Sequence, residues 1–149
     1  MPYHFKLETI LNLRRNLEEQ AQLRLAAEQR TLAGHTEKLD DLQRDRVLMI
    51  NEMERRKKKK MTGAMFSLYM DGVINQDWRI QVQHNTIKAQ EQVVEQARQA
   101  LFSAVQQRKI MDKVKEKDFL QYRQEELRRE QIDNDEQAVL RYKGTNAQL

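Results

Sequence analysis

The chain has 149 residues, of which 39% are hydrophobic and 34% are charged, and its formal net charge is +4. So polar a composition cannot fill a thick globular core, but it suits a narrow apolar seam between two helices. The length allows one domain at most, and the absence of cysteine excludes disulfides and thiolate metal sites. We therefore expect a single coiled-coil domain over residues 1–149.

Residues that break helices are rare in this chain. Its single proline is Pro2, and of its four glycines Gly63 and Gly72 lie near the middle of the sequence. Proline and glycine cost roughly 3 and 1 kcal/mol in a helix interior relative to alanine. The sequence therefore predicts two very long helices joined by one central break.

The first predicted helix covers about residues 6–60 and carries a heptad-like stripe. Steps of three or four residues link most of its members, and successive steps of four around Leu17 indicate a stutter. The stripe consists of Ile10, Leu13, Leu17, Ala21, Leu25, Leu32, His35, Leu39, Leu42, Arg46, Met49 and Met53. Gly34 lies within this helix and is expected to weaken it locally.

The window over about residues 61–76 differs in composition from the rest of the chain. It is rich in methionine, aromatic and aliphatic residues, contains Gly63 and Gly72, and has one charged residue, Asp71, up to residue 75. We expect a bent connection here that contains a short helix. Its apolar residues either pack against the flanking helices or form an exposed docking patch, and we favour docking.

The second predicted helix covers about residues 77–141, and residues 143–149 are expected to form a disordered tail. Its seam residues are expected to be Ile87, Gln90, Val94, Ala97, Leu101, Ala104, Arg108 and Met111, and then, after a second stutter, Lys115, Phe119, Tyr122, Glu126 or Leu127, and Glu130. Because the two helices are predicted to be similar in length, we expect an all-α fold, a long antiparallel two-helix coiled coil. Its chain ends would then lie together at one tip.

A run of six basic residues, Arg55, Arg56, Lys57, Lys58, Lys59 and Lys60, accounts for the positive net charge. Outside it, 21 basic residues face 23 acidic ones. We interpret the run mainly as a solvated helix end whose cations complement the helix dipole. Nucleic-acid binding is a lesser interpretation, and attraction to an anionic membrane surface stays open.

The chain shows no arrangement of residues that is typical of catalysis or of metal binding. His4, His35 and His84 form no HExxH motif, and no phosphate-binding or nucleophile motif occurs. We therefore expect no enzyme activity, no cofactor and no metal. No apolar run is long enough for a membrane span, and the N-terminus lacks the features of a signal peptide.

Three stretches together resemble one known family. Residues 5–14 begin with an aromatic residue and a basic-leucine pair, and residues 108–117 form a basic segment that Tyr122 and Arg123 soon follow. Residues 130–136 resemble a closing acidic pattern. The combination resembles the FliJ family of flagellar type III export proteins, whose architecture the YscO-type injectisome stalk proteins share.

The resemblance implies an antiparallel coiled coil similar to the central stalk of rotary ATPases. It further implies that the paired chain ends bind the hexameric flagellar export ATPase, and that another part contacts the cytoplasmic domain of the export gate. Escort of flagellar export chaperones and a cytoplasmic, peripheral position at the inner-membrane export apparatus also follow from it. The alternative is a basic coiled-coil nucleic-acid-binding or scaffold protein.

The resemblance also assigns candidate contact residues. Those for the export gate are Leu68, Tyr69, Val73 and Ile74. Those for the ATPase are Phe5, Leu7, Arg14, Tyr122, Arg123, Arg129, Glu130, Asp133 and Glu136.

Overall fold

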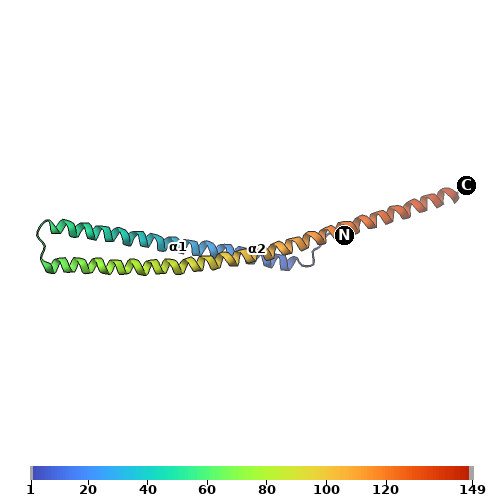
Figure 1. Cartoon of the computed structure of the whole chain (residues 1–149). Coiled ribbons are helices and arrows are strands. Elements are labelled where there is room, and N and C mark those ends of the chain that lie inside the picture. Colours follow the sequence, from blue (N-terminus) through green and yellow to red (C-terminus); the bar gives the residue numbers. More distant parts are fainter. Residues whose placement is uncertain (1, 148–149) are drawn as a thin grey trace. The chain divides into compact units, whose positions relative to one another are not determined.

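The fold consists of two helices, α1 (Glu8–Lys57) and α2 (Gly63–Ala147), in a computed structural model that describes residues 2–147 (Figure 1). The described residues contain no strand. The predicted all-α helical hairpin is therefore confirmed. Contacts divide the chain into two units, Glu19–Ser103 and a second unit that combines residues up to 18 with residues from 104 onward.

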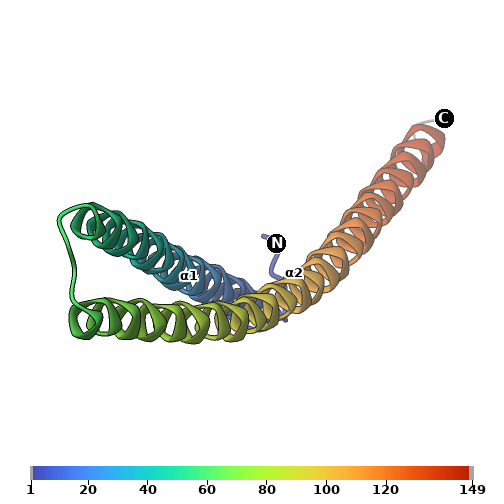
Figure 2. The ribbon, with the colours of Figure 1, turned by 60° about the vertical axis from the view of Figure 1, so that its left-hand side comes forward.

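The unit Glu19–Ser103 is an antiparallel pair of helices closed by a short loop over residues 58–62 (Figure 2). Its buried apolar residues recur at heptad spacing along both helices: Leu39, Met53, Val73, Val94 and Ala97. This thin line of contact is the whole apolar core of the unit, as the polar composition predicts. Many other large apolar side chains remain exposed.

Three glutamines of α2 fix how the two helices of this unit are aligned. Gln76 and Gln83 are buried, and each donates a 2.8 Å hydrogen bond to a carbonyl of α1, at Leu42 and His35 respectively. Gln90 donates one of 3.0 Å to the carbonyl of Glu28. Donors and acceptors both step by seven residues in opposite directions, so the three bonds repeat one antiparallel register.

The connection between the helices is shorter than the sequence predicted. We expected it over about residues 61–76, but α2 begins at Gly63 and runs through Gly72. The hydroxyl of Thr62 accepts a 3.2 Å hydrogen bond from the backbone N–H of Met65 and so caps the helix. The chain reverses at Lys60, whose φ of 69° is left-handed. The prediction gave the glycines too much weight as helix breakers. The packing of Val73 and Gln76 at heptad positions stabilises the helix by more than one interior glycine costs.

In the second unit, an N-terminal strap of residues 2–7 and the first turns of α1 pack along α2 from residue 104 to residue 122. The seam here runs through Leu11, which is fully buried, and through Arg14 and Glu18. The predicted seam residues Ile10, Leu13 and Leu17 are exposed. That prediction was wrong because it followed the spacing of the apolar residues. The seam continues its heptad repeat without a break here, and polar pairs occupy its positions.

The seam of α2 also continues without the second predicted stutter. After Lys115 it passes through Asp118 and Tyr122, both half-buried, and Phe119 is exposed. The described residues from 123 to 145 are all exposed. Pairing between the two helices therefore ends near Tyr122.

The expectation that the chain ends lie together was wrong, because the helices differ in length. α1 has 50 residues and α2 has 85. The strap contacts α2 near Tyr122, and α2 continues to Ala147, about 40 Å further along its axis. Of the expected tail over residues 143–149, residues 143–147 belong to α2, and residues 148–149 lie outside the described part.

Over residues 2–147, neither helix carries an apolar stretch that would cross a bilayer.

Candidate partner-binding surfaces

The N-terminal strap is held on α2 by an aromatic cluster. The hydroxyl of Tyr3 donates a 3.0 Å hydrogen bond to the carboxylate of Asp118. Its ring packs edge-on against Phe119 and tilted against Tyr122, with centroids 5.1 Å and 5.2 Å away. Burial in this cluster, and next the bond to Asp118, raise the pKa of the Tyr3 hydroxyl above its ordinary value. The strap is thus a fixed part of the surface rather than a loose end.

The next residue of the strap to face α2 is Phe5, which is buried. The ammonium of Lys115 lies 6.0 Å from the centre of the Phe5 ring and 3.0 Å from the carboxylate of Glu8. Cation–π attraction and the ion pair therefore both hold the start of α1 against α2. Phe5, one of the residues predicted to contact the ATPase, is buried against α2 and supports the strap without being exposed to a partner.

A row of ion pairs continues this attachment along the first turns of α1. The half-buried guanidinium of Arg108 bonds the carboxylate of Glu18 and, at 2.6 Å, that of Asp112. Asp112 also lies 3.6 Å from Arg15. The bond to Asp112, followed by the bond to Glu18, raises the pKa of Arg108. Arg14, another predicted contact residue, donates a 2.5 Å bond to Gln107.

A groove of about 710 Å³ lies between the strap and the exposed part of α2. Four of the residues predicted for the ATPase line it: Tyr122, Arg129, Glu130 and Asp133. The strap contributes Tyr3, His4 and Lys6 to the opposite wall. The structure therefore brings part of the predicted set together on one surface.

The remaining predicted residues lie elsewhere. Leu7 and Arg123 are exposed but do not line the groove. Glu136 lines a separate hollow of about 570 Å³ on the surface of α2, and it does so together with Ile132, Val139 and Leu140. This hollow lies on a stretch of helix that has no packing partner among the described residues.

The segment of α2 over residues 123–145 combines mixed charge with exposed apolar residues. Arg128 and Arg129 pair with Glu125 within the helix, at 3.1 Å and 3.8 Å. The exposed apolar residues of the segment are Leu127, Ile132, Val139, Leu140 and Tyr142. Single helices in water are marginal without tertiary packing, so such a surface is typical of a segment that a partner covers.

The four residues predicted for the export gate do not share one exposed face. Val73 is buried and Tyr69 is half-buried, and both point into the seam with α1. Leu68 and Ile74 are exposed. Leu68 and Ile74 are therefore the most accessible of the four.

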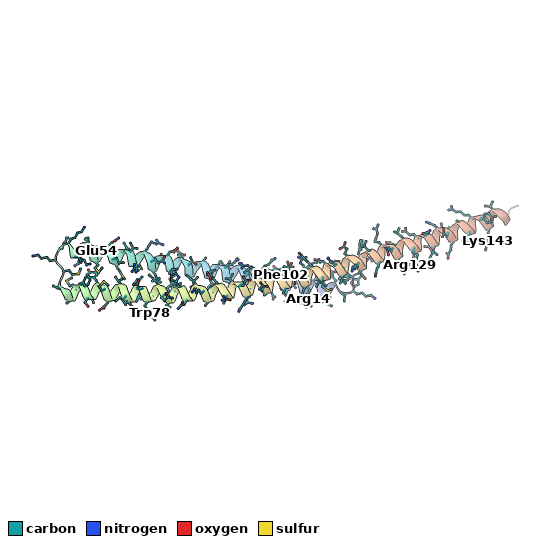
Figure 3. All side chains as sticks on the ribbon, in the orientation of Figure 1. Arg14, Glu54, Trp78, Phe102, Arg129 and Lys143 are labelled. Carbon is teal, nitrogen blue, oxygen red and sulfur yellow. The ribbon has the colours of Figure 1, made fainter. Side chains whose placement is uncertain are left out.

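Sequence reasoning missed Trp78, the single tryptophan of the chain, which is 67% exposed (Figure 3). It follows Ile74 by one helical turn and precedes Val82 by another, and all three side chains are exposed. Residues spaced by four lie on one face of a helix. The four-residue spacing of Ile74, Trp78 and Val82, all outside the seam positions, was the signal that could have found this apolar stripe.

The described residues contain no group of three or more histidine, cysteine, aspartate or glutamate side chains that could hold a metal. His35 is half-buried in the seam, where its backbone carbonyl accepts the bond from Gln83.

A comparison with models of protein families gives a match over residues 3–147, to the family described as flagellar FliJ protein. Searches of curated proteins and of solved structures gave no match. The matched range includes the strap, both helices and the exposed segment of α2.

Proposed function

The chain belongs to the FliJ family, which makes it a flagellar export protein, and we propose that it acts there as a stalk-like, non-enzymatic partner of the hexameric export ATPase. In this proposal the protein promotes assembly and hydrolysis by the ATPase, contacts the cytoplasmic domain of the export gate and escorts export chaperones. It works in the cytoplasm, at the periphery of the inner-membrane export apparatus.

The observation that carries the proposal is the exposed segment of α2 beyond Tyr122. No residue of it from 123 to 145 is buried, although it carries large apolar side chains on a continuous helix. An apolar helical surface of this kind is stabilised when a partner covers it. The groove beside the strap overlaps the start of this segment, where Arg129, Glu130 and Asp133 carry mixed charge that suits guided association with a charged ring interior.

The proposed gate contact differs in composition from the predicted set. Leu68 and Ile74 stay in it because they are exposed, and the exposed residues Trp78 and Val82 of α2 join it. Tryptophan is enriched among the residues that contribute most to binding. Tyr69 and Val73 support the contact from within the seam.

The experiment is to mix the protein with the flagellar export ATPase of the same organism and to follow both ATP hydrolysis and ring formation. We expect both to rise with added protein until they saturate. Unchanged hydrolysis together with unchanged ring formation would contradict the proposal. The scaffold alternative predicts that result.

A further inference from the structure

The loop end of the unit Glu19–Ser103 carries an unbalanced positive charge. Between Glu54 and Asp71 the sequence contains six basic residues and no acidic one. α2 has no acidic residue in its first turn, so no negative charge there offsets the positive end of its dipole. The charge is therefore concentrated at the loop and does not extend along the helices.

Ion pairs within α1 divide this basic run into two halves. Glu52 pairs with Arg55 and Arg56 at 2.7 Å and 3.2 Å, and Glu54 pairs with Lys57 at 3.4 Å. Among the described residues, no carboxylate lies within ion-pair distance of the three lysines over residues 58–60. The earlier interpretation of a solvated helix end therefore accounts for the arginines and Lys57 but leaves three lysines without a local role.

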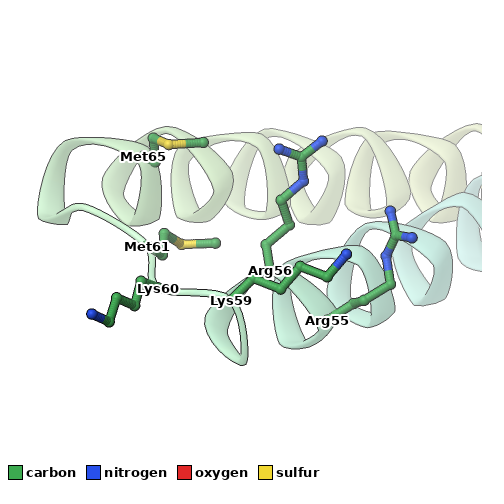
Figure 4. Close-up of a pocket in the computed structure, with 6 residues that line it drawn as sticks. All are labelled: Arg55, Arg56, Lys59, Lys60, Met61 and Met65. Carbon is green, nitrogen blue, oxygen red and sulfur yellow. The ribbon is translucent and has the colours of Figure 1, made fainter.

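Apolar side chains lie among these cations. Lys59, Lys60, Met61 and Met65 line a hollow of about 340 Å³ at the loop, together with Arg55 and Arg56 (Figure 4). Phe66 is partly exposed next to them, with the ammonium of Lys57 5.0 Å from its ring centre. Leu68 follows and is highly exposed.

We propose that this loop end docks on the surface of a lipid bilayer that contains anionic lipids. The lysines over residues 58–60 lie against the headgroups, and Met65 and Phe66 enter the interfacial region between headgroups and acyl chains. Flexible lysines suit a diffuse negative surface because they need no fixed partner geometry. Apolar side chains beside them gain from leaving water, so the two contributions add.

Nucleic acid is a poorer match to the same residues. Binding to a duplex requires basic side chains spread along a face or groove. Here the rest of the chain is nearly balanced in charge, with 21 basic and 23 acidic residues outside the run. The exposed methionine and leucine would have no counterpart on a phosphate backbone.

The first test measures co-sedimentation of the full chain with phosphatidylcholine vesicles, with and without phosphatidylglycerol. We expect binding to the anionic vesicles alone, lost when salt rises from about 0.1 M to about 1 M and the Debye length falls from about 10 Å to about 3 Å. Replacing Lys58, Lys59 and Lys60 together by glutamine should weaken it on the order of 100-fold.

The matched control replaces Lys109, Lys113 and Lys117 by glutamine, three exposed lysines of α2 that also have no ion pair within the described part of the chain. This variant should bind nearly as well as the unchanged protein. An equal loss in both variants, or equal binding to neutral vesicles, would overturn the proposal. So would tighter binding to duplex DNA than to the anionic vesicles with the same dependence on residues 58–60.

The second test reports on insertion through fluorescence. Because Trp78 is the single tryptophan, the double substitution Phe66→Trp, Trp78→Phe moves the probe to the loop end. Its emission should shift to the blue with anionic vesicles and be quenched by brominated acyl chains. Trp78 in the unchanged protein, about 18 Å further along α2, should respond much less. No shift at position 66 would contradict insertion.

Discussion

The side-chain amide of Gln83 donates a 2.8 Å hydrogen bond to the backbone carbonyl of His35 on the opposite helix. Gln76 and Gln90 repeat the arrangement one heptad to either side, on Leu42 and Glu28. A helical carbonyl already accepts its own backbone bond and has a second lone pair free. Each glutamine therefore finds an acceptor for its side-chain amide only when the two helices are in this register.

Replacing Gln83 by alanine should lower the free energy of unfolding by about 1–2 kcal/mol, because the bond is lost and a small cavity remains. Urea denaturation followed by circular dichroism measures this. The matched change, Gln92→Ala, affects an exposed glutamine of the same helix and should stay within about 0.5 kcal/mol. Equal effects at both positions would contradict a role of Gln83 in the seam.

The glycines inside the helices offer a second prediction. An added Cβ at Gly34 or Gly72 would meet no atom within 4 Å. Either substitution to alanine should therefore raise the free energy of unfolding by roughly 1 kcal/mol. Gly144→Ala should leave the cooperative transition unchanged, because the end of α2 packs against nothing among the described residues. A loss of stability at Gly34 would show that the helix needs glycine there.

The Tyr3 hydroxyl gives a pH-dependent prediction. Burial, and next the bond to Asp118, raise its pKa above the ordinary value of 10.0. A raised pKa means that the stabilisation is fully present below pH 10 and is lost as pH rises through the folded-state pKa. The difference in phenolate absorbance between the unchanged protein and Tyr3→Phe should therefore have its midpoint above pH 10. A midpoint at or below pH 10 would contradict the attachment of the strap.

Trp78 gives a prediction for the export gate. Its emission should shift to the blue when the cytoplasmic gate domain is added, and Trp78→Ala should weaken that complex by about 2 kcal/mol. Phe102→Ala removes another exposed aromatic residue of α2 and should have little effect. Val73→Ala should reduce stability rather than intrinsic affinity, since Val73 is buried in the seam. A gate complex insensitive to Trp78 would place the contact elsewhere.

The sequence predicted the seam correctly at several polar positions, among them His35, Gln90 and Arg108, but it failed over the first turns of α1. Leu39 and Met53 were identified correctly because their heptad positions are apolar. Glu18 was missed, since its partner Arg108 lies 90 residues away and no local pattern joins the two. A run such as Ile10, Leu13 and Leu17 then has the stronger apolar signal, although all three are exposed.

The candidate surfaces were predictable only in part. Four residues of the predicted ATPase set, Tyr122, Arg129, Glu130 and Asp133, line one groove, whereas the others of the set lie elsewhere. Exposure within a helix could not be predicted without the register, so Val73 was placed on a surface and Trp78 was passed over. The lengths of the two helices were also predicted wrongly. Gly72 was interpreted as a helix break, although packing tolerates a glycine at that position. Contacts divide the chain into two units, so its unfolding as one domain remains a prediction.

The central claim is that the exposed segment of α2 binds the export ATPase, and affinity measured by titration calorimetry tests it most directly. The chain provides two adjacent valine–leucine pairs of similar exposure. Val139 and Leu140 are 52% and 68% exposed on the segment, and Val47 and Leu48 are 54% and 65% exposed on α1. Each pair is replaced by two glutamines, which are good helix formers.

We predict that Val139→Gln, Leu140→Gln weakens binding of the ATPase by roughly 30-fold, equivalent to about 2 kcal/mol. The matched change, Val47→Gln, Leu48→Gln, should leave the affinity within about threefold of the unchanged protein. Full affinity in the first variant with a large loss in the second would contradict the account, because the ATPase would then be held by the paired helices.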